Sequence, residues 1–273
     1  MILIFALACT PTVALNPIAD TDDTGATSDG GSADGGGADG GTDTTEPDWS
    51  MYEGATLTVI SPESGAFYPL GTPVPFEAVL IAADGSELPM DDIAWATNVD
   101  SAWAGSGGEF SDELTVGTHT ITAQASLPNG DRLGWTVSGV LVQHEDAGTY
   151  VGDLSVDFVI EYEGTPITTT CFGAATLYVD AWGEVATGDS GCTLSLLGYE
   201  LASTYAFDLA VDEGEVEGSA ALDLVLWESN FDAVGTVQDG ELLAEWESSL
   251  LGYIDFAGEL DLVRISRETE ADG

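Results

Sequence analysis

Lysine is absent from this chain of 273 residues, and arginine occurs so rarely that lysine and arginine together number 3, against 49 aspartates and glutamates. The formal net charge is −46 at pH 7. Too little positive charge is therefore present to neutralise a phosphate backbone or to hold an anionic membrane surface. The absence of lysine also excludes a Schiff-base nucleophile and a phosphate-loop lysine. Nucleic acid is excluded as a partner.

Long apolar runs are also lacking, so the sequence predicts no membrane-spanning helix. The chain opens with eight apolar residues, which fit the lower limit of a signal-peptide core. The next residue is Cys9, and the segment Ala6-Leu7-Ala8-Cys9 resembles the lipobox of bacterial lipoproteins. This resemblance implies cleavage after Ala8, a diacylglycerol on Cys9 and a place at the outer membrane or cell surface. The alternative is an ordinary secretory signal that leaves a soluble protein with an unmodified Cys9.

Cysteine is scarce, with three residues in the whole chain. Three cysteines in an exported protein leave one without a partner, and lipidation of Cys9 accounts for it. Cys171 and Cys192 then remain, and we expect them to form a disulfide in an oxidising compartment.

The composition along the chain divides it into five segments. Residues 20–48 are rich in Asp, Gly and Thr and contain no side chain large enough to join a core, which predicts a disordered acidic stalk. Repeated Asp-Gly-Gly units there suggest calcium, but no apolar residue accompanies each turn, so a solvated spacer is the favoured interpretation. The expected segments are a signal peptide at 1–8, a linker at 9–50, a β-sandwich at 51–145, a second β domain at 146–266 and a disordered tail at 267–273.

The first β domain shows short apolar stretches separated by turn signals, at the spacing of a β-sandwich. Four of its elements, at 59–65, 71–76, 93–95 and 114–123, resemble the Ig-like and polycystic-kidney-disease-type repeats of bacterial surface proteins. The resemblance implies that Trp95 is the core tryptophan and that the domain acts as a spacer or weak binding module. His119 has the same parity as Ile121 and Ala123, so we expect a buried, hydrogen-bonded structural histidine.

The second β domain has longer strands in which apolar and polar residues alternate, as in half-buried antiparallel strands. Eight such strands predict an up-and-down barrel, with a second β-sandwich as the alternative. Asp and Glu occupy the outward positions, so we expect the barrel to stand in water. The expected strands are 150–162, 167–180, 184–196, 203–212, 215–227, 230–239, 241–249 and 253–264.

A Gly-x-Tyr-x-Gly motif at 148–152 and strand glycines at Gly218, Gly235 and Gly258 resemble the soluble barrels of transferrin-binding-protein-like surface lipoproteins. A hairpin turn on Ala181-Trp182 would place Cys171 directly opposite Cys192, within reach of a disulfide. The same register pairs Ile167 with Leu196 and Leu177 with Ala186.

Catalytic motifs are missing: the sequence has no Gly-x-Ser-x-Gly, Cys-x-x-Cys or His-Glu-x-x-His. His119 and His144 have no further ligand at metal spacing, so neither a metal nor another cofactor is expected. With this many acidic residues, some pairs of carboxylates fall at a catalytic spacing by chance, so their spacing does not indicate an active site. The acidic surplus favours a strongly solvated surface with weakly bound cations. The sequence favours a non-catalytic binding or structural protein of the envelope. A secreted hydrolase that uses a carboxylate pair on the barrel rim is the alternative.

An internal repeat suggests where a partner docks. Residues 195–199, Ser-Leu-Leu-Gly-Tyr, recur at 249–253, and in an up-and-down barrel both segments connect strands at the same end. We expect an apolar mouth there, pointing away from the membrane, that anchors a protein or hydrophobic ligand. The alternative is that these side chains fold inward and fill the barrel. The candidate residues are Tyr162, Leu196, Leu197, Tyr199, Trp227, Leu250, Leu251 and Tyr253.

Overall fold

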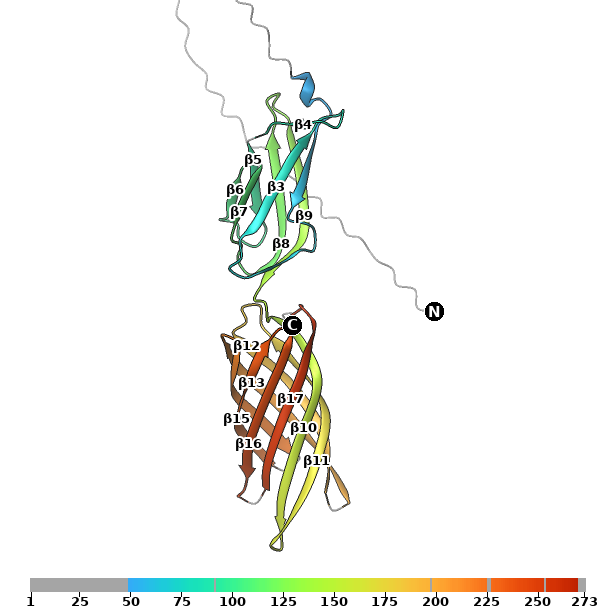
Figure 1. The fold of residues 1–273 in the computed structure, drawn as a ribbon, viewed down its shortest axis with the longest axis vertical. Coiled ribbons are helices and arrows are strands. Elements are labelled where there is room, and N and C mark those ends of the chain that lie inside the picture. The colour runs from blue at the N-terminus through green and yellow to red at the C-terminus, as the bar shows by residue number, and fades with distance from the viewer. Residues whose placement is uncertain (1–48, 91, 197, 225–226, 253, 270–273) are drawn as a thin grey trace, which may run out of the picture. The chain divides into compact units, whose positions relative to one another are not determined.

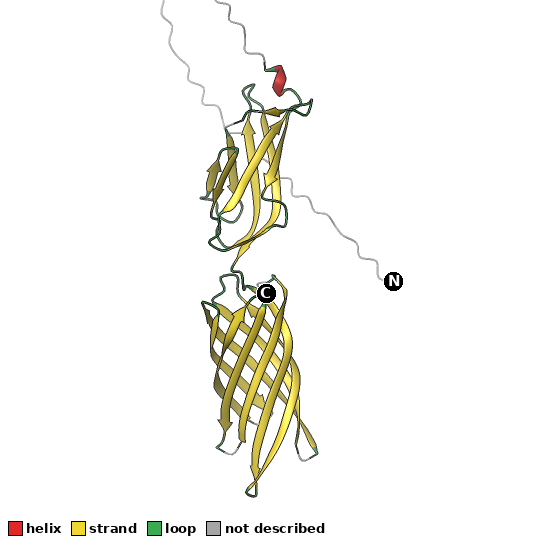
Figure 2. Ribbon diagram, viewed as in Figure 1, coloured by secondary structure: helices red, strands yellow, loops and turns green. Residues whose placement is uncertain are grey.

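The computed structural model describes residues 49–269, apart from 91, 197, 225–226 and 253. Strands make up nearly all of its regular structure, and the described helical structure is a single 3-10 turn, η1 (Ser50–Tyr52), shown in red in Figure 2. The prediction of an all-β protein is therefore confirmed. The expected signal peptide, Cys9 and nearly all of the acidic stalk lie outside the described residues.

The N-terminal β domain consists of two sheets with a shared core. One sheet has the order β1-β3-β4, with β7 also paired to β3, and the other has the order β2-β9-β8-β5-β6. All pairs are antiparallel except β2 with β9. Figure 1 labels most of these strands. They are β1 (Thr56–Ser61), β2 (Phe67–Pro69), β3 (Val74–Ile81), β4 (Glu87–Leu88), β5 (Ile93–Thr97), β6 (Ala104–Ser106), β7 (Glu109–Asp112), β8 (Gly117–Ser126) and β9 (Arg132–Gln143).

Trp95 lies in the core of this sandwich, as predicted, with 2% of its surface exposed. Its ring packs edge-on against Phe76 of the opposite sheet, 5.2 Å between centroids, and its Nε1 donates to the carbonyl of Gly107 at 2.9 Å. His119 is fully buried and bonds to the Thr97 hydroxyl and the Thr115 carbonyl, each at 2.7 Å. Both ring nitrogens are thus satisfied, which confirms a structural role for this histidine.

The C-terminal domain is a closed antiparallel barrel in which each strand pairs with its neighbours in sequence and β17 closes on β10. The barrel prediction is confirmed, and the sandwich alternative for this domain is wrong. We call the end formed by the last residues of β10, β12, β14 and β16 the far end, and the opposite end the near end. The strands are β10 (Gly148–Tyr162), β11 (Thr165–Val179), β12 (Val185–Leu196), β13 (Tyr199–Asp212), β14 (Glu215–Leu224), β15 (Trp227–Gln238), β16 (Glu241–Leu250) and β17 (Ile254–Ser266).

Alternating burial along these strands produces the barrel, because every second side chain enters one continuous apolar core. Tight two-residue turns connect three of the hairpins. In each turn an acidic residue and a glycine both have positive φ, which matches the type I′ geometry that suits twisted strands. The turns are Glu163-Gly164, Glu213-Gly214 and Asp239-Gly240.

The near end is held by hydrogen bonds to the segment that joins β9 to β10. The guanidinium groups of Arg264 and Arg267 both donate to the carbonyl of Glu145. The hydroxyl of Tyr150 donates to the carbonyl of Asp146 at 2.7 Å. Two of the three arginines in the chain are therefore at the near end.

The predicted register of the cysteine hairpin is wrong by two residues. Cys192 lies opposite Gly173 and not opposite Cys171, and Leu177 pairs with Gly188 instead of Ala186. The same shift removes the expected pairing of Ile167 with Leu196. The cause is the turn, since Asp180 and Val185 form its closing hydrogen bond and four residues, not two, lie between them. A shift of two residues keeps every side chain on its predicted face, so the alternation pattern does not distinguish the two registers.

Candidate functional site

The barrel divides toward its far end into two four-stranded sheets. Ladders of nine to fifteen residue pairs run within the sheet β16-β17-β10-β11 and within the sheet β12-β13-β14-β15. The two ladders that join these sheets are shorter, with seven pairs between β11 and β12 and five between β15 and β16. Both short ladders lie toward the near end. Over the described residues, the far halves of these strands form two seams without ladder pairs.

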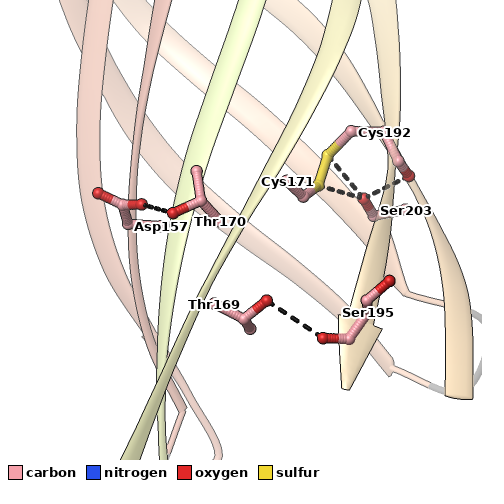
Figure 3. The surroundings of a disulfide bond; sticks show 7 residues. All are labelled: Asp157, Thr169, Thr170, Cys171, Cys192, Ser195 and Ser203. Atoms are coloured by element: carbon pink, nitrogen blue, oxygen red, sulfur yellow. Dashed lines mark hydrogen bonds between the residues drawn. A yellow bond between two sulfur atoms is a disulfide. The ribbon is translucent and has the colours of Figure 1, made fainter. Parts of the chain in front are cut away.

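The disulfide lies at the start of the seam between β11 and β12, where the ladder of these two strands ends. Cys192 belongs to the last residue pair of the β11–β12 ladder, and Cys171 lies two residues beyond it on β11. The bond crosses the strands diagonally, with 5.7 Å between the α-carbons. Figure 3 shows Ser203 beside both sulfurs, where its hydroxyl donates to the carbonyl of Cys192 at 3.1 Å. The disulfide is therefore a covalent link between the two sheets at the end of their backbone ladder, and beyond it the Thr169 hydroxyl donates to the Ser195 carbonyl at 3.2 Å.

Between the two sheets, at the far end, lies a cavity of about 240 Å³. Among the described residues the lining is entirely apolar. Each sheet contributes four of these lining residues, with Leu251 of the β16–β17 connection counted in the first sheet. Trp227 and Leu251 are both lining residues and exposed, so the cavity reaches the surface. The lining residues are Phe158, Ile160, Leu251 and Ile254 from the first sheet, and Leu194, Leu201, Leu224 and Trp227 from the second.

The structure places the described members of the predicted partner-binding set at this same end, and their exposure differs. Leu250 is buried, with 6% of its surface exposed. Leu196 ends β12, and its side chain is not described, while Leu197 and Tyr253 lie outside the described residues. The exposed residues are Tyr162 at 54%, Tyr199 at 74%, Trp227 at 38% and Leu251 at 53%. Of the five candidates whose side chains are described, Trp227 and Leu251 line the cavity.

Sequence reasoning missed most of the cavity lining. Among the lining residues it did not name are Ile160, Leu201 and Leu224. A signal was available, because each of these residues has the inward parity in the far-end part of its strand. Period-two alternation identifies such positions. It does not show that the space between them stays unfilled, which depends on how the two sheets separate.

Beyond the cavity, aromatic rings fill the barrel. Trp246 contacts Tyr205, Phe207 and Phe231, with ring centroids 5.4 to 6.0 Å apart. The Tyr205 hydroxyl and Trp246 Nε1 are buried without a hydrogen-bond partner among the described residues. Burial raises the pKa of Tyr205 to about 12, and the nearby Ser203 hydroxyl acts in the opposite direction.

The described residues contain no candidate metal site. No three His, Cys, Asp or Glu side chains in residues 49–269, gaps excepted, are arranged to hold a metal ion. His144 Nδ1 lies 3.8 Å from a carboxylate oxygen of Asp146, and this pair belongs to no described group of three potential metal ligands. None of the described helical structure is long and apolar enough to cross a bilayer.

Comparison with known proteins identifies no family. No protein-family model and no curated protein matches the chain. Among solved structures, the chain is similar to the fibronectin(III)-like modules of Clostridium thermocellum CbhA, at 15% sequence identity and a TM-score of 0.27. That match covers 65% of this chain and 92% of the other. At this TM-score it supports no argument about fold or function, so the function must be inferred from the site itself.

Proposed function

We propose that this is a non-catalytic, lipid-anchored protein of the bacterial cell surface whose barrel binds a ligand at its far end. The observation that carries the proposal is the apolar cavity between the two sheets, because it reaches the surface beside exposed Trp227 and Leu251. Apolar cavities remain dry and accept apolar ligands of matching size. An exposed apolar rim on a protein of this acidity marks an interaction site.

The anchor rests on the N-terminal sequence and on cysteine pairing. Cys171 and Cys192 are bonded to each other, so Cys9 has no cysteine partner left in the chain. Lipidation of Cys9 gives that residue a role, and the acidic stalk then acts as a spacer between membrane and sandwich. The β-sandwich would extend this spacer, as its resemblance to repeats of bacterial surface proteins implies.

The binding role is tested with a neutral apolar probe. Toluene binding to the full chain is measured by ligand-observed NMR, for the unchanged protein and for Leu201→Trp, which fills the cavity from a half-buried lining position. Leu243→Trp on the outer face of β16 is the matched control. We expect binding to the unchanged protein and the control and a loss in Leu201→Trp. Equal binding by all three proteins, or by none of them, contradicts the proposal.

The anchor is tested separately. Mass spectrometry of the N-terminal peptide from membrane-extracted protein should show diacylglycerol on Cys9, and Cys9→Ser should move the protein to the soluble fraction. An unmodified thiol refutes the anchor and leaves the binding role standing. A screen of the Cys9→Ser protein for hydrolysis of common glycans tests the non-catalytic role, and turnover would support the hydrolase alternative.

A further inference from the structure

Acidic side chains surround the far-end cavity in a regular pattern. Because side chains alternate along a strand, each inward residue has outward neighbours. For six of the eight described lining residues one of those neighbours is acidic, and all six acids are exposed. The pairs of lining residue and acid are Phe158 with Asp157, Ile160 with Glu161, Leu201 with Glu200, Leu224 with Asp223, Trp227 with Glu228, and Ile254 with Asp255.

No basic residue of the described chain balances these acids. The chain contains no lysine. Arg132 belongs to strand β9 of the sandwich, and Arg264 and Arg267 bond to the Glu145 carbonyl at the near end. The far-end carboxylates therefore produce a negative potential at the cavity mouth, which attracts cations and repels anions within a Debye length of about 8 Å at physiological salt.

Exposed aromatic rings at the same end also favour a cation. Tyr162, Tyr199 and Trp227 are all at least one-third exposed. Aromatic faces attract cations through the ring quadrupole, and quaternary ammonium groups are recognised in this way. The aromatic rings are a feature independent of the carboxylates, and both features favour a positively charged ligand.

We propose that the cavity takes the short apolar tail of an organic ammonium ion, whose charged group stays at the acidic and aromatic rim. This inference rests on the proposed function and identifies the ligand class of the same site. An apolar cavity of about 150 Å³ holds a benzene ring, so a cavity of about 240 Å³ suits a tail of about six to eight carbon atoms. A fatty acid or an alkyl sulfate has a fitting tail but brings a negative group to a negative rim.

The test compares three series of ligands with tails of four to ten carbons: alkyltrimethylammonium ions, alcohols and alkyl sulfates. Binding to the full chain is measured by titration calorimetry at low and physiological salt. Each added methylene should tighten binding about fourfold until the cavity is full. At low salt, the ammonium ion should bind about tenfold more tightly than the alcohol of equal length, and salt should reduce this advantage. The sulfates should bind most weakly.

Two triple variants with the same change in net charge locate the effect. Replacing Glu161, Glu200 and Glu228 at the far end with glutamine should remove most of the ammonium advantage and leave alcohol affinity unchanged. Replacing Glu215, Glu217 and Glu241 at the near end with glutamine should leave the advantage nearly intact. Equal loss in both variants contradicts a local rim effect.

The outcomes separate this inference from the function on which it rests. If alcohols bind as tightly as ammonium ions, the charge inference is overturned and the apolar ligand site remains. If sulfates bind best, the inference is overturned in the same way. If no ligand of any series binds, both the inference and the proposed binding function fail.

Discussion

Cys171 is bonded to Cys192 although the residue directly opposite Cys192 is Gly173. The bond thus joins the last ladder pair, which contains Cys192, to the residue two positions beyond it on β11. At this place it limits how far the sheets separate, whereas the β15–β16 seam has no covalent link of this kind.

Replacing both cysteines with alanine should lower the free energy of unfolding by about 3 kcal/mol, as expected for closing a loop of this size. Urea denaturation measures the loss. Hydrogen exchange should also accelerate in 165–172 and 193–196, next to the broken link, and much less at the β15–β16 seam. Uniform acceleration at both seams would mean that the disulfide stabilises the barrel as a whole.

Tyr205 and Tyr150 are a matched pair for testing buried hydroxyl groups. The Tyr205 hydroxyl lacks a partner among the described residues, and the Tyr150 hydroxyl bonds to the Asp146 carbonyl. An unpaired buried polar group costs about 1 to 3 kcal/mol, and a typical hydrogen bond contributes about 1 kcal/mol. Tyr205→Phe should therefore stabilise the barrel and Tyr150→Phe should destabilise it, as measured by denaturant unfolding. Destabilisation by both would show that the Tyr205 hydroxyl has a favourable interaction.

Alkaline pH should weaken the fold through Tyr205. Its pKa is about 12 in the folded protein and about 10 when unfolded. Because the folded pKa is the higher one, the stability it contributes is complete below pH 10 and is lost as pH rises toward 12. The loss reaches at most about 3 kcal/mol. Thermal unfolding from pH 9 to 12 should show it, and Tyr205→Phe should reduce it. Burial also raises the pKa of Tyr150, so part of the alkaline loss should persist in that variant.

Gly258 makes room for the indole of Trp246. The two residues are paired across β16 and β17, and a β-carbon at Gly258 would overlap the indole ring. Gly258→Ala should displace the ring and cost about 1 to 3 kcal/mol of stability. Gly134→Ala, on β9 with no close neighbour, is the control and should be near neutral. Combining Gly258→Ala with Trp246→Phe should recover part of the loss, because the smaller ring needs less space. No change in stability for Gly258→Ala alone would contradict this account of the packing.

The sequence alone determined the class of the fold, the eight barrel strands and the tight turns at Glu213-Gly214 and Asp239-Gly240, whereas the turn expected on Ala181-Trp182 was wrong. These are local properties, since period-two alternation marks a half-buried strand and an acidic residue followed by glycine suits a type I′ turn. It also determined which faces are buried and that Cys171 and Cys192 share the interior, because face depends only on parity. His119 was correctly assigned to the sandwich core for the same reason, and Trp95 was correctly assigned to it from the resemblance to Ig-like repeats.

Only the tertiary structure decided the register, the seams and the cavity. The four-residue turn between Asp180 and Val185 moved the cysteine hairpin by two positions, a shift that parity does not detect. The cavity depends on where the β11–β12 and β15–β16 ladders stop, and the two partners of each ladder belong to different sheets. Alternation within one strand carries no information on how far its edge stays paired with the next. The residues that line the cavity were therefore visible in the sequence as inward positions, and the space between them was not.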